Sequence, residues 1–295
     1  MNILLTGANG FLGKIIKEEF SKAHNVFDLS RTVGNYKVFL EKETPFFKEK
    51  FEIIIHAAGK AHSLPKIEFE RKQFYDVNVT GTENLLNGLE KSGIPKSFIF
   101  ISSVAVYGQE SGIGINEEHK LEAKDAYGLS KIEAELLVQK WCNEHNVVCT
   151  ILRLPLLVGK NPPGNLGAMI KGITKGYYFN IGGGKAKKSM VLAEDAAAFI
   201  STIANIGGVY NLTDGYHPSF FELSIAIARQ IQKSAPMNMP MFVAKVVGFM
   251  GDFLGNKAPI NSQKLKKITA DLTFDDSKAR SVGWQPRRVL DWFSI

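Results

Sequence analysis

The stretch Thr6-Gly7-Ala8-Asn9-Gly10-Phe11-Leu12-Gly13 joins a short apolar run at residues 2–6 to a helical pattern at residues 11–22. Glycines at this spacing permit a tight turn and let a pyrophosphate approach backbone N–H groups at the positive end of the helix dipole. Three glycines alone are weak evidence, because an ordinary turn uses the same residues. Their place at the first strand–helix junction indicates a dinucleotide-binding turn.

Outward from this turn, β-rich runs alternate with helical patterns. We expect strands at residues 2–6, 25–30, 51–57, 97–102 and 147–154, and helices at residues 11–22, 68–91 and 127–144. Such alternation forms right-handed βαβ units with a parallel sheet. The strands are continuously apolar, as is usual when helices cover both faces of a sheet. The sequence therefore predicts an α/β fold with a Rossmann-type doubly wound parallel sheet.

The regular alternation ends after Pro155. Glycine and proline cluster between residues 159 and 184, helices are expected at 220–233 and 241–254, and a late strand is expected at 209–213. We expect residues 1–158 to form an NAD(P)-binding Rossmann domain. Residues 159–295 are expected to form a smaller substrate-binding lobe, with some late segments returning to the first domain.

The composition of the 295-residue chain, 45% hydrophobic and 22% charged, is that of a globular protein with an ample core. The formal net charge of +7 comes from scattered lysines and arginines without an aromatic platform, so an anionic small molecule is expected and nucleic acid is not. Two cysteines, Cys142 and Cys149, form no C-x-x-C pair, and no leader precedes the first strand, so we expect a cytoplasmic protein. We expect no membrane span and no catalytic metal.

The end of the second expected strand, Val26-Phe27-Asp28-Leu29-Ser30-Arg31, bears on the choice of cofactor. An acidic residue at the strand tip would bind the adenosine ribose 2′-OH, whereas an arginine accommodates a 2′-phosphate. Asp28 is expected inside the strand and Ser30-Arg31 at its tip. This favours NADP over NAD, although Arg31 could also be an ordinary surface charge.

Tyr127 and Lys131 lie four residues apart on an expected helix and therefore share a face. A lysine ammonium beside a phenol favours the phenolate, which lets the tyrosine exchange a proton with a substrate hydroxyl. Ser103, at the carboxyl end of the expected strand 97–102, can hydrogen-bond the same oxygen. Tyr-x-x-x-Lys occurs often by chance, but the combination with the glycine turn and Ser103 is specific.

With these motifs the chain resembles, over nearly its whole length, the extended short-chain dehydrogenase/reductase family and its nucleotide-sugar epimerase/dehydratase branch. The resemblance rests on the glycine turn, His56-Ala57-Ala58-Gly59, Asn78-Val-Thr-Gly-Thr-Glu-Asn84, Ser-Ser-x-x-Val-Tyr-Gly at 102–108, Tyr127 with Lys131, Leu152-Arg153-Leu-Pro155, and Asp-Ser-Lys-Ala-Arg-Ser-Val-Gly-Trp-Gln-Pro at 276–286.

The resemblance implies a catalytic set and two binding sets. Ser103, Tyr127 and Lys131 are the implied catalytic residues, and Lys131 would also hold the nicotinamide ribose. The implied cofactor-binding residues are Gly7, Asn9, Gly10, Phe11, Leu12, Gly13, Ser30, Arg31, Ala57, Ala58, Gly59, Asn78, Lys131 and Pro155. For Asn78, support of the active-site water or backbone and simple helix packing are both open. Asn165, Lys188 and Arg280 would contact the nucleotide diphosphate, with surface charge as the alternative for the two basic residues.

Two aromatic residues of the lobe are open to either of two roles. Tyr178 and Phe179 could stack on a uracil base, although a core role is expected for at least one of them.

The residues after Ser103 restrict the reaction. Dehydratases of this branch carry an Asp-Glu pair where this chain has Val104 and Ala105, which cannot transfer protons. The resemblance then implies hydride transfer at C4 of a sugar that we expect to be UDP-linked, either as net reduction of a 4-keto sugar or as 4-epimerisation. Two features favour reduction of a UDP-4-keto-6-deoxy-N-acetylhexosamine. One is Ser30-Arg31. The other is the segment Lys264-Leu-Lys-Lys-Ile-Thr-Ala-Asp-Leu-Thr-Phe, which looks like bacterial 4-ketoreductases of surface polysaccharide synthesis.

Three further alternatives stay open. One is a cofactor-binding regulator without catalysis, which the presence of Tyr127 and Lys131 disfavours. A second is membrane or partner docking by the apolar helix expected near 241–253, for which buried core or dimer packing is the commoner explanation. A third is a homodimer through the helices expected at 68–91 and 127–144.

Overall fold

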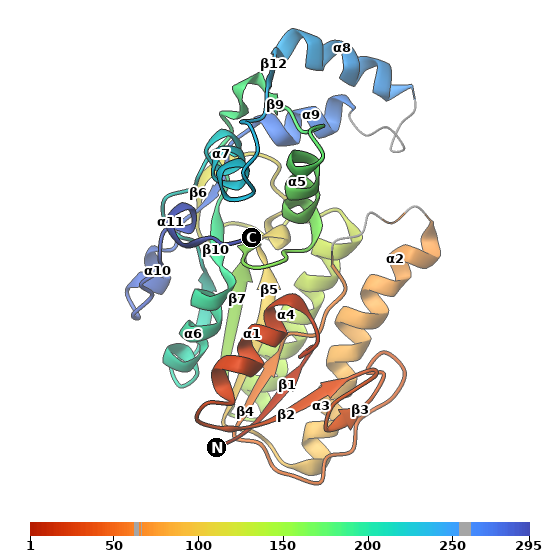
Figure 1. Ribbon diagram of the computed structural model, residues 1–295. Helices are drawn as coiled ribbons and strands as arrows, with labels where there is room; N and C mark the ends of the chain where they lie inside the picture. The colour runs from red at the N-terminus through yellow and green to blue at the C-terminus, as the bar shows by residue number, and fades with distance from the viewer. Residues whose placement is uncertain (62–64, 66, 254–260) are drawn as a thin grey trace.

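The computed structural model describes residues 1–61, 65, 67–253 and 261–295. Its centre is a parallel sheet with the strand order β11-β7-β5-β4-β1-β2-β3 across the described residues (Figure 1). These strands are β1 (Asn2–Thr6), β2 (Asn25–Ser30), β3 (Tyr36–Lys37), β4 (Ile53–His56), β5 (Ser97–Ser103), β7 (Val148–Leu154) and β11 (Gly208–Asn211). The strand order reverses between β1 and β4, and the ligand crevice of such sheets lies at the carboxyl ends of the strands at this reversal.

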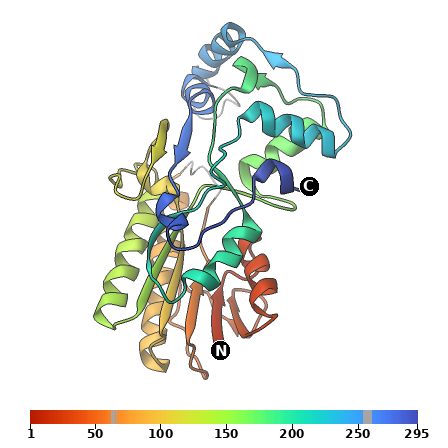
Figure 2. The same cartoon turned by 90° about the vertical axis from the view of Figure 1, so that its left-hand side faces the viewer.

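Helices cover both faces of the sheet. On one face α1 (Phe11–Phe20) packs beside α6 (Ala193–Ile203), and on the other α3 (Gly81–Ser92) and α2 (Glu68–Tyr75) pack beside α4 (Ala126–Glu144) (Figures 1 and 2). Successive side chains of β1 pack on opposite faces of the sheet. Ile3 and Leu5 belong to the core under α1, whereas Leu4 belongs to the core under α3 and α4. This accounts for the continuous apolar strands, and the predicted α/β doubly wound sheet is confirmed.

The remaining elements form a second region beyond the carboxyl ends of the strands (Figure 1). Its helices are α5 (Gly164–Thr174), α7 (Phe220–Gln230), α8 (Met241–Asp252), α9 (Ser262–Thr269) and α11 (Val289–Trp292), whereas α10 (Ser277–Arg280) contacts β11 of the central sheet. Its strands are β6 (Gly112–Ile115), β8 (Leu156–Val158), β9 (Asn180–Ile181), β10 (Met190–Leu192), β12 (Asn238–Met239) and β13 (Leu272–Phe274). A separate apolar cluster that includes Leu166, Leu223 and Ile227 holds α5 and α7 together.

The expected elements agree with the structure at most positions, but the short strand β3 of the central sheet was not expected. The helix expected at 68–91 is interrupted by a π-helical turn, η1 (Asp76–Thr80), and the lobe contains short strands that the pattern did not reveal. The late strand ends at Asn211 as β11, where it pairs with β7, so this segment returns to the main sheet. The helix expected at 241–254 is α8, and Leu254 lies outside the described residues.

The outer face of α8 corrects one expectation. Buried core was a leading explanation for its apolar stripe, yet Phe242 is 71% exposed, Phe249 63% and Phe253, just after the helix, 81%. The core explanation is therefore wrong for these side chains. No helix of the described residues is long and apolar enough to cross a membrane.

Candidate active site

The glycine turn lies against the segment that follows β4, at the point where the strand order reverses. Gly7 has a positive φ of 71°, and a Cβ there would lie 2.6 Å from the Ala58 backbone nitrogen. A Cβ on Gly13 would lie 2.1 Å from the Gly7 carbonyl oxygen. The structure thus brings Gly7 to Gly13 and Ala57 to Gly59 together, with glycine required where backbones nearly touch.

A chain of buried hydrogen bonds fixes the segment after β4. The Ala58 N–H donates to Thr6 Oγ1 at 3.1 Å, and Thr6 Oγ1 lies 2.6 Å from His56 Nδ1. His56 Nε2 lies 2.9 Å from Thr82 Oγ1, which donates to the Asn78 carbonyl. With these partners Nδ1 accepts and Nε2 donates, so the ring is neutral. Burial accordingly lowers the pKa of His56 to about 3.

The tip of β2 has the arrangement that the sequence predicted. Asp28 is buried inside the strand, where Lys17 Nζ binds its carboxylate at 2.8 Å and the Asn35 N–H donates to it at 3.0 Å. Ser30 ends the strand and receives a hydrogen bond from Asn9 Nδ2 at 2.9 Å, which links the glycine turn to the β2 tip. Arg31 follows as an exposed residue. The cofactor contacts of these residues stay predictions.

Asn78 lies in the π-helical turn η1, a local distortion that is frequent at functional sites. Its Oδ1 accepts the Lys60 N–H at 2.7 Å, while its Nδ2 donates to the Lys60 carbonyl at 3.1 Å and to Ser130 Oγ at 2.9 Å. Ser130 Oγ in turn donates to the Tyr127 carbonyl at 2.8 Å. Both amide hydrogens are therefore used, and Asn78 links the Lys60 backbone to Ser130 beside Tyr127. Which of its two expected roles Asn78 plays stays a prediction.

The start of α4 sets the position of Tyr127. The Asp125 side chain caps the helix by accepting the N–H groups of Tyr127 at 3.1 Å and Gly128 at 3.0 Å. A Cβ on Gly128 would lie 2.5 Å from the Ala123 Cβ and 2.8 Å from the Ala105 carbonyl oxygen. Gly128 thus lets α4 approach the turn after Ser103. The sequence analysis missed this role, although Tyr-Gly at the start of a predicted helix was a usable signal.

Ser103 and Tyr127 are brought together at the end of β5. Ser103 Oγ accepts the Ala105 N–H at 3.2 Å, which holds its side chain at the strand end. Burial raises the pKa of Tyr127, the Ser103 hydroxyl opposes this shift, and the Asp125 carboxylate adds to it. Burial is thus the largest influence on this pKa, and the help that Lys131 is expected to give the phenolate stays a prediction.

The Lys131 amine has partners other than the phenol. Its Nζ donates to the Ile101 carbonyl at 2.7 Å and lies 3.9 Å from the centre of the Phe100 ring. Burial lowers the pKa of Lys131 to about 7, and the Glu135 carboxylate partly opposes that shift. A Cβ on Gly59 would lie 4.0 Å from this Nζ, so the amine borders the segment after β4.

The predicted diphosphate ligands are dispersed over the lobe. Asn165 is an exposed residue in the first turn of α5. Lys188 is half-buried and donates from Nζ to the Lys267 carbonyl at 3.0 Å; burial lowers its pKa and Asp271 opposes this. Tyr178 packs against the lobe core, in agreement with the core role expected for one of the two aromatics. Pro155 separates β7 from β8.

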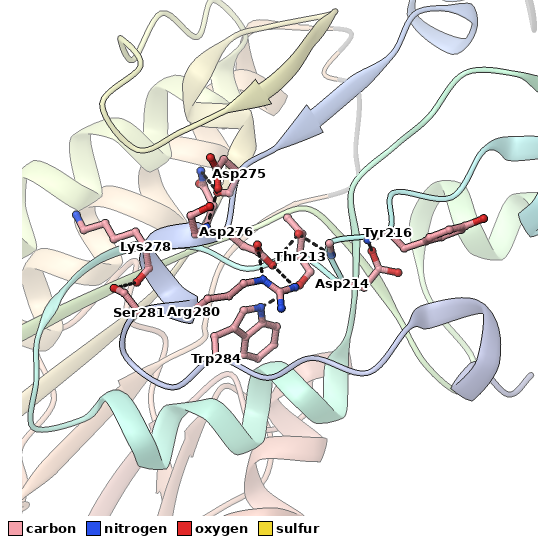
Figure 3. Close-up of polar contacts among 12 residues, drawn as sticks. Thr213, Asp214, Tyr216, Asp275, Asp276, Lys278, Arg280, Ser281 and Trp284 are labelled. Carbon is pink, nitrogen blue, oxygen red and sulfur yellow. Dashed lines mark hydrogen bonds and ion pairs between the residues drawn. The ribbon is translucent and has the colours of Figure 1, made fainter.

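Arg280 has an internal partner (Figure 3). Its Nε and Nη2 bind the two carboxylate oxygens of Asp276 at 2.8 and 3.1 Å, and Asp276 also accepts the Thr213 hydroxyl at 3.0 Å. The helix that carries Arg280, α10, contacts the edge strand β11. The structure therefore favours a structural ion pair for Arg280, and its phosphate contact stays a prediction without support from this position.

The residues around the crevice fit a nicotinamide dinucleotide. The glycine turn exposes backbone at the start of α1, a side chain at Gly59 would press on Asn78 Oδ1 at 3.2 Å, and Lys131 borders the same segment. Gly7 to Gly13 would hold the pyrophosphate, Ser30 and Arg31 the adenosine ribose, and Lys131 the nicotinamide ribose. Within the described residues, no group of three or more His, Cys, Asp or Glu side chains is placed to hold a metal ion.

The fold and the Ser103, Tyr127 and Lys131 arrangement define a nicotinamide-dependent enzyme of the short-chain dehydrogenase/reductase type. The sequence profile of the NAD dependent epimerase/dehydratase family matches residues 3–212, and the chain belongs to this family.

Several curated relatives match almost the whole chain, and two of them are 4-epimerases. An N-acetyl-alpha-D-glucosaminyl-diphospho-ditrans,octacis-undecaprenol 4-epimerase from Escherichia coli O157:H7 is 28% identical over 96% of this chain and 90% of its own length. A UDP-glucose 4-epimerase from Vibrio cholerae is 27% identical over 98% of this chain and 92% of its own length. A GDP-6-deoxy-D-mannose reductase from Pseudomonas aeruginosa is 32% identical over 47% of this chain and 46% of its own length.

Solved structures share the fold. The UDP-glucose 4-epimerase of Thermotoga maritima, solved with UDP-glucose, has a TM-score of 0.74 at 20% identity, with 97% of this chain and 94% of that chain covered. RMD from Pseudomonas aeruginosa, solved with NADPH, has the same TM-score at 21% identity, with 98% and 94% covered.

Proposed function

We propose that this protein is a 4-epimerase of a hexose or N-acetylhexosamine that is joined through a diphosphate to its carrier. The observation that carries the proposal is the meeting of Ser103 and Tyr127 at the end of β5, with Lys131 one helical turn along α4. The non-ionisable side chains of Val104 and Ala105, where dehydratases have an acid and a base, support a reaction confined to C4. Two of the relatives that match almost the whole chain carry 4-epimerase names.

The chain's own residues supply binding and proton transfer. A nicotinamide cofactor held by the glycine turn and Lys131 would supply the hydride acceptor and donor for C4. Ser103 would hydrogen-bond the oxygen at C4 and stabilise the charge that develops there. Tyr127 would take the proton of that oxygen as the hydride leaves C4, and would return the proton when the hydride comes back. The amine of Lys131 would meet a ribose hydroxyl at the edge of the crevice.

Net reduction of a 4-keto sugar is the second candidate, and a specific observation favours it. Arg31 is exposed directly after the β2 tip, in the position that suits a 2′-phosphate, and Asp28 is engaged by Lys17 and Asn35 rather than available to a ribose. NADPH as a consumable reductant is consistent with this arrangement. An epimerase instead retains one cofactor through both half-reactions.

One experiment separates the candidates. The purified protein is mixed with UDP-GlcNAc, UDP-glucose, polyprenyl-diphosphate-linked GlcNAc in detergent, or a UDP-4-keto-6-deoxy-N-acetylhexosamine, each with NAD or NADPH, and the sugars and the 340-nm absorbance are followed. Interconversion of C4 epimers without net cofactor change supports the epimerase. Stoichiometric NADPH loss on the keto sugar supports the reductase, and silence on every substrate would leave a cofactor-binding regulator.

The cofactor choice has its own control. Arg31→Ala is expected to weaken NADPH about tenfold or more while NADH is little affected, because only the former has a 2′-phosphate. Lys14→Ala, another exposed cation of the first domain, should change neither affinity.

A further inference from the structure

The helix α8 buries its small residues and exposes large apolar ones, the reverse of the usual pattern. Its small residues Ala244, Gly248 and Gly251 are buried, and a Cβ on Gly248 would lie 3.6 Å from Leu265 of α9. Its large apolar residues point away from the protein. The exposed fractions are 71% for Phe242, 58% for Val246, 63% for Phe249, 64% for Met250 and 81% for Phe253.

These exposed side chains form one stripe. Residues 242, 246, 249 and 253 are spaced by four, three and four positions, which places them on a single helix face. Phe249 and Phe253 contact each other edge to face at 5.5 Å between ring centres. Figure 1 places α8 at the far end of the lobe from the central sheet. A soluble helix normally presents polar residues on such a face.

The charges around the stripe are mostly positive. The helices α8 and α9 carry four lysines, Lys245, Lys264, Lys266 and Lys267, and one acidic residue, Asp252. Asp252 is engaged within the protein, because its carboxylate accepts the Ser262 N–H at 2.9 Å and the Ser262 hydroxyl at 2.6 Å. Lys267 pairs with Glu110 at 3.0 Å, whereas Lys245 and Lys266 line the groove between the two helices. A surface that combines aromatic side chains with lysines complements an anionic lipid headgroup layer.

We propose that α8 is a membrane-docking helix that lays its outer apolar stripe into the surface of an anionic bilayer, with Lys245 and Lys266 contacting lipid phosphates. A 12-residue helix is about 18 Å long, which is shorter than the roughly 30 Å hydrocarbon core, so α8 lies in the interface and does not span it. The stripe consists of side chains that are each more than half exposed. A fluid lipid surface covers such side chains without a shaped counterpart.

Docking would bring the predicted substrate site to the membrane. The C-terminal turn of α9 contacts that site through the 3.0 Å hydrogen bond from Lys188 Nζ to the Lys267 carbonyl. A sugar diphosphate anchored on a lipid would then reach the lobe from the side on which α8 lies. This last step rests on the proposed function, whereas the docking itself does not.

Vesicle flotation tests the docking without any substrate. The full-length protein is floated with vesicles of phosphatidylcholine, alone or mixed with phosphatidylglycerol. Wild type is expected to float with the mixed vesicles. Phe249→Gln/Phe253→Gln is expected to bind about 100-fold more weakly, because two aromatic side chains no longer leave water. Lys245→Gln/Lys266→Gln should lose about tenfold or more on the anionic vesicles and little on phosphatidylcholine alone.

Matched controls separate docking from general stickiness and from self-association. Phe46 is 73% exposed and Ile113 81% exposed, both outside α8, so Phe46→Gln/Ile113→Gln should float like wild type. Wild type that fails to float, or that loses binding equally with this control pair, would overturn the proposal. So would a wild-type oligomer that the Phe249/Phe253 variant converts to monomer without any lipid binding by either protein.

A turnover arm keeps docking separate from catalysis. The Phe249/Phe253 variant should keep wild-type turnover on a soluble UDP-sugar and lose turnover only on the lipid-linked sugar in vesicles. Flotation with no turnover on any substrate would refute the proposed function and leave the docking intact.

Discussion

The Arg153 guanidinium forms a buried salt bridge with the Glu135 carboxylate, with Nη2 2.7 Å from Oε2 and Nε 3.1 Å from Oε1. Both side chains are almost fully buried, and Glu135 also accepts the Ser102 hydroxyl. Glu135 lies one helical turn after Lys131 on α4, and Arg153 lies on β7. The pair therefore connects α4, which carries Tyr127 and Lys131, to the central sheet. It also neutralises a buried carboxylate that contacts Ser102 at the end of β5.

Breaking this pair from one side should destabilise the protein strongly. Arg153→Met leaves the Glu135 carboxylate buried without its partner, and we expect the free energy of unfolding to fall by about 3–5 kcal/mol. Arg153→Met/Glu135→Met removes both charges and should recover most of that loss. Urea denaturation of the three proteins measures both effects, and a single variant as stable as wild type would refute the argument.

Gly128 should matter to both packing and catalysis, because a Cβ there meets Ala123 and the Ala105 carbonyl. We expect Gly128→Ala to cost about 1–3 kcal/mol of stability through overpacking and to lower turnover by displacing Tyr127. Gly81→Ala is the matched control, since Gly81 is also helical and a Cβ there would find ordinary contact at 3.5 Å. That control should be stabilised by about 0.4–1 kcal/mol. Equal effects of the two substitutions would contradict this account.

The sequence was sufficient for the sheet and for the meeting of Ser103 with Tyr127, because strand ends and helix spacing follow from local pattern. It could not place Asn78, whose partners Lys60 and Ser130 come from distant segments. The role of Arg280 could not be predicted from the sequence either. The motif around Arg280 looks the same whether or not Asp276 pairs with it, but the pairing engages the guanidinium within the protein. The pKa of Tyr127 likewise depends on burial, which no residue spacing reports.

Lys131 should make stability depend on pH above neutrality. Its pKa is lowered to about 7 in the folded protein by burial, whereas an unfolded lysine titrates near 10.4. Below about pH 7 both states are protonated, so the full cost of the buried charge is present. Between about 7 and 10 the unfolded state binds more protons, and stability rises by up to about 1.4 kcal/mol per pH unit. Lys131→Met removes this contribution.

The measurement is urea denaturation of wild type and Lys131→Met from pH 6 to pH 9. The variant's advantage in the free energy of unfolding should be largest at pH 6 and should shrink steadily above pH 7. A difference that does not change with pH would mean that the lysine keeps an ordinary pKa in the folded protein.

Tyr127→Phe tests proton transfer at the candidate site. Loss of the phenol oxygen should lower turnover by about 10²–10⁴-fold, because the group that exchanges the proton at the C4 oxygen is removed, while binding of the cofactor is retained. Ser103→Ala should cost about 10²–10³-fold through loss of one donor to the oxygen at C4. Turnover under saturating substrate separates these losses from weaker binding. A Phe variant with wild-type turnover would remove Tyr127 from the reaction.

Lys188 and Arg280 should respond differently to removal of their charges, because only one of them is already held by a carboxylate. Arg280→Ala removes a partly exposed ion pair with Asp276, so we expect a loss of about 1 kcal/mol in stability and an unchanged KM. Lys188→Ala should instead raise KM for a sugar diphosphate about tenfold, since the amine would lose contact with phosphate. Lys278→Ala, exposed on the same short helix as Arg280, is the control for unspecific charge loss. A raised KM for Arg280→Ala at unchanged stability would restore the phosphate contact that the motif implied, and would mean that the guanidinium leaves Asp276 when substrate binds.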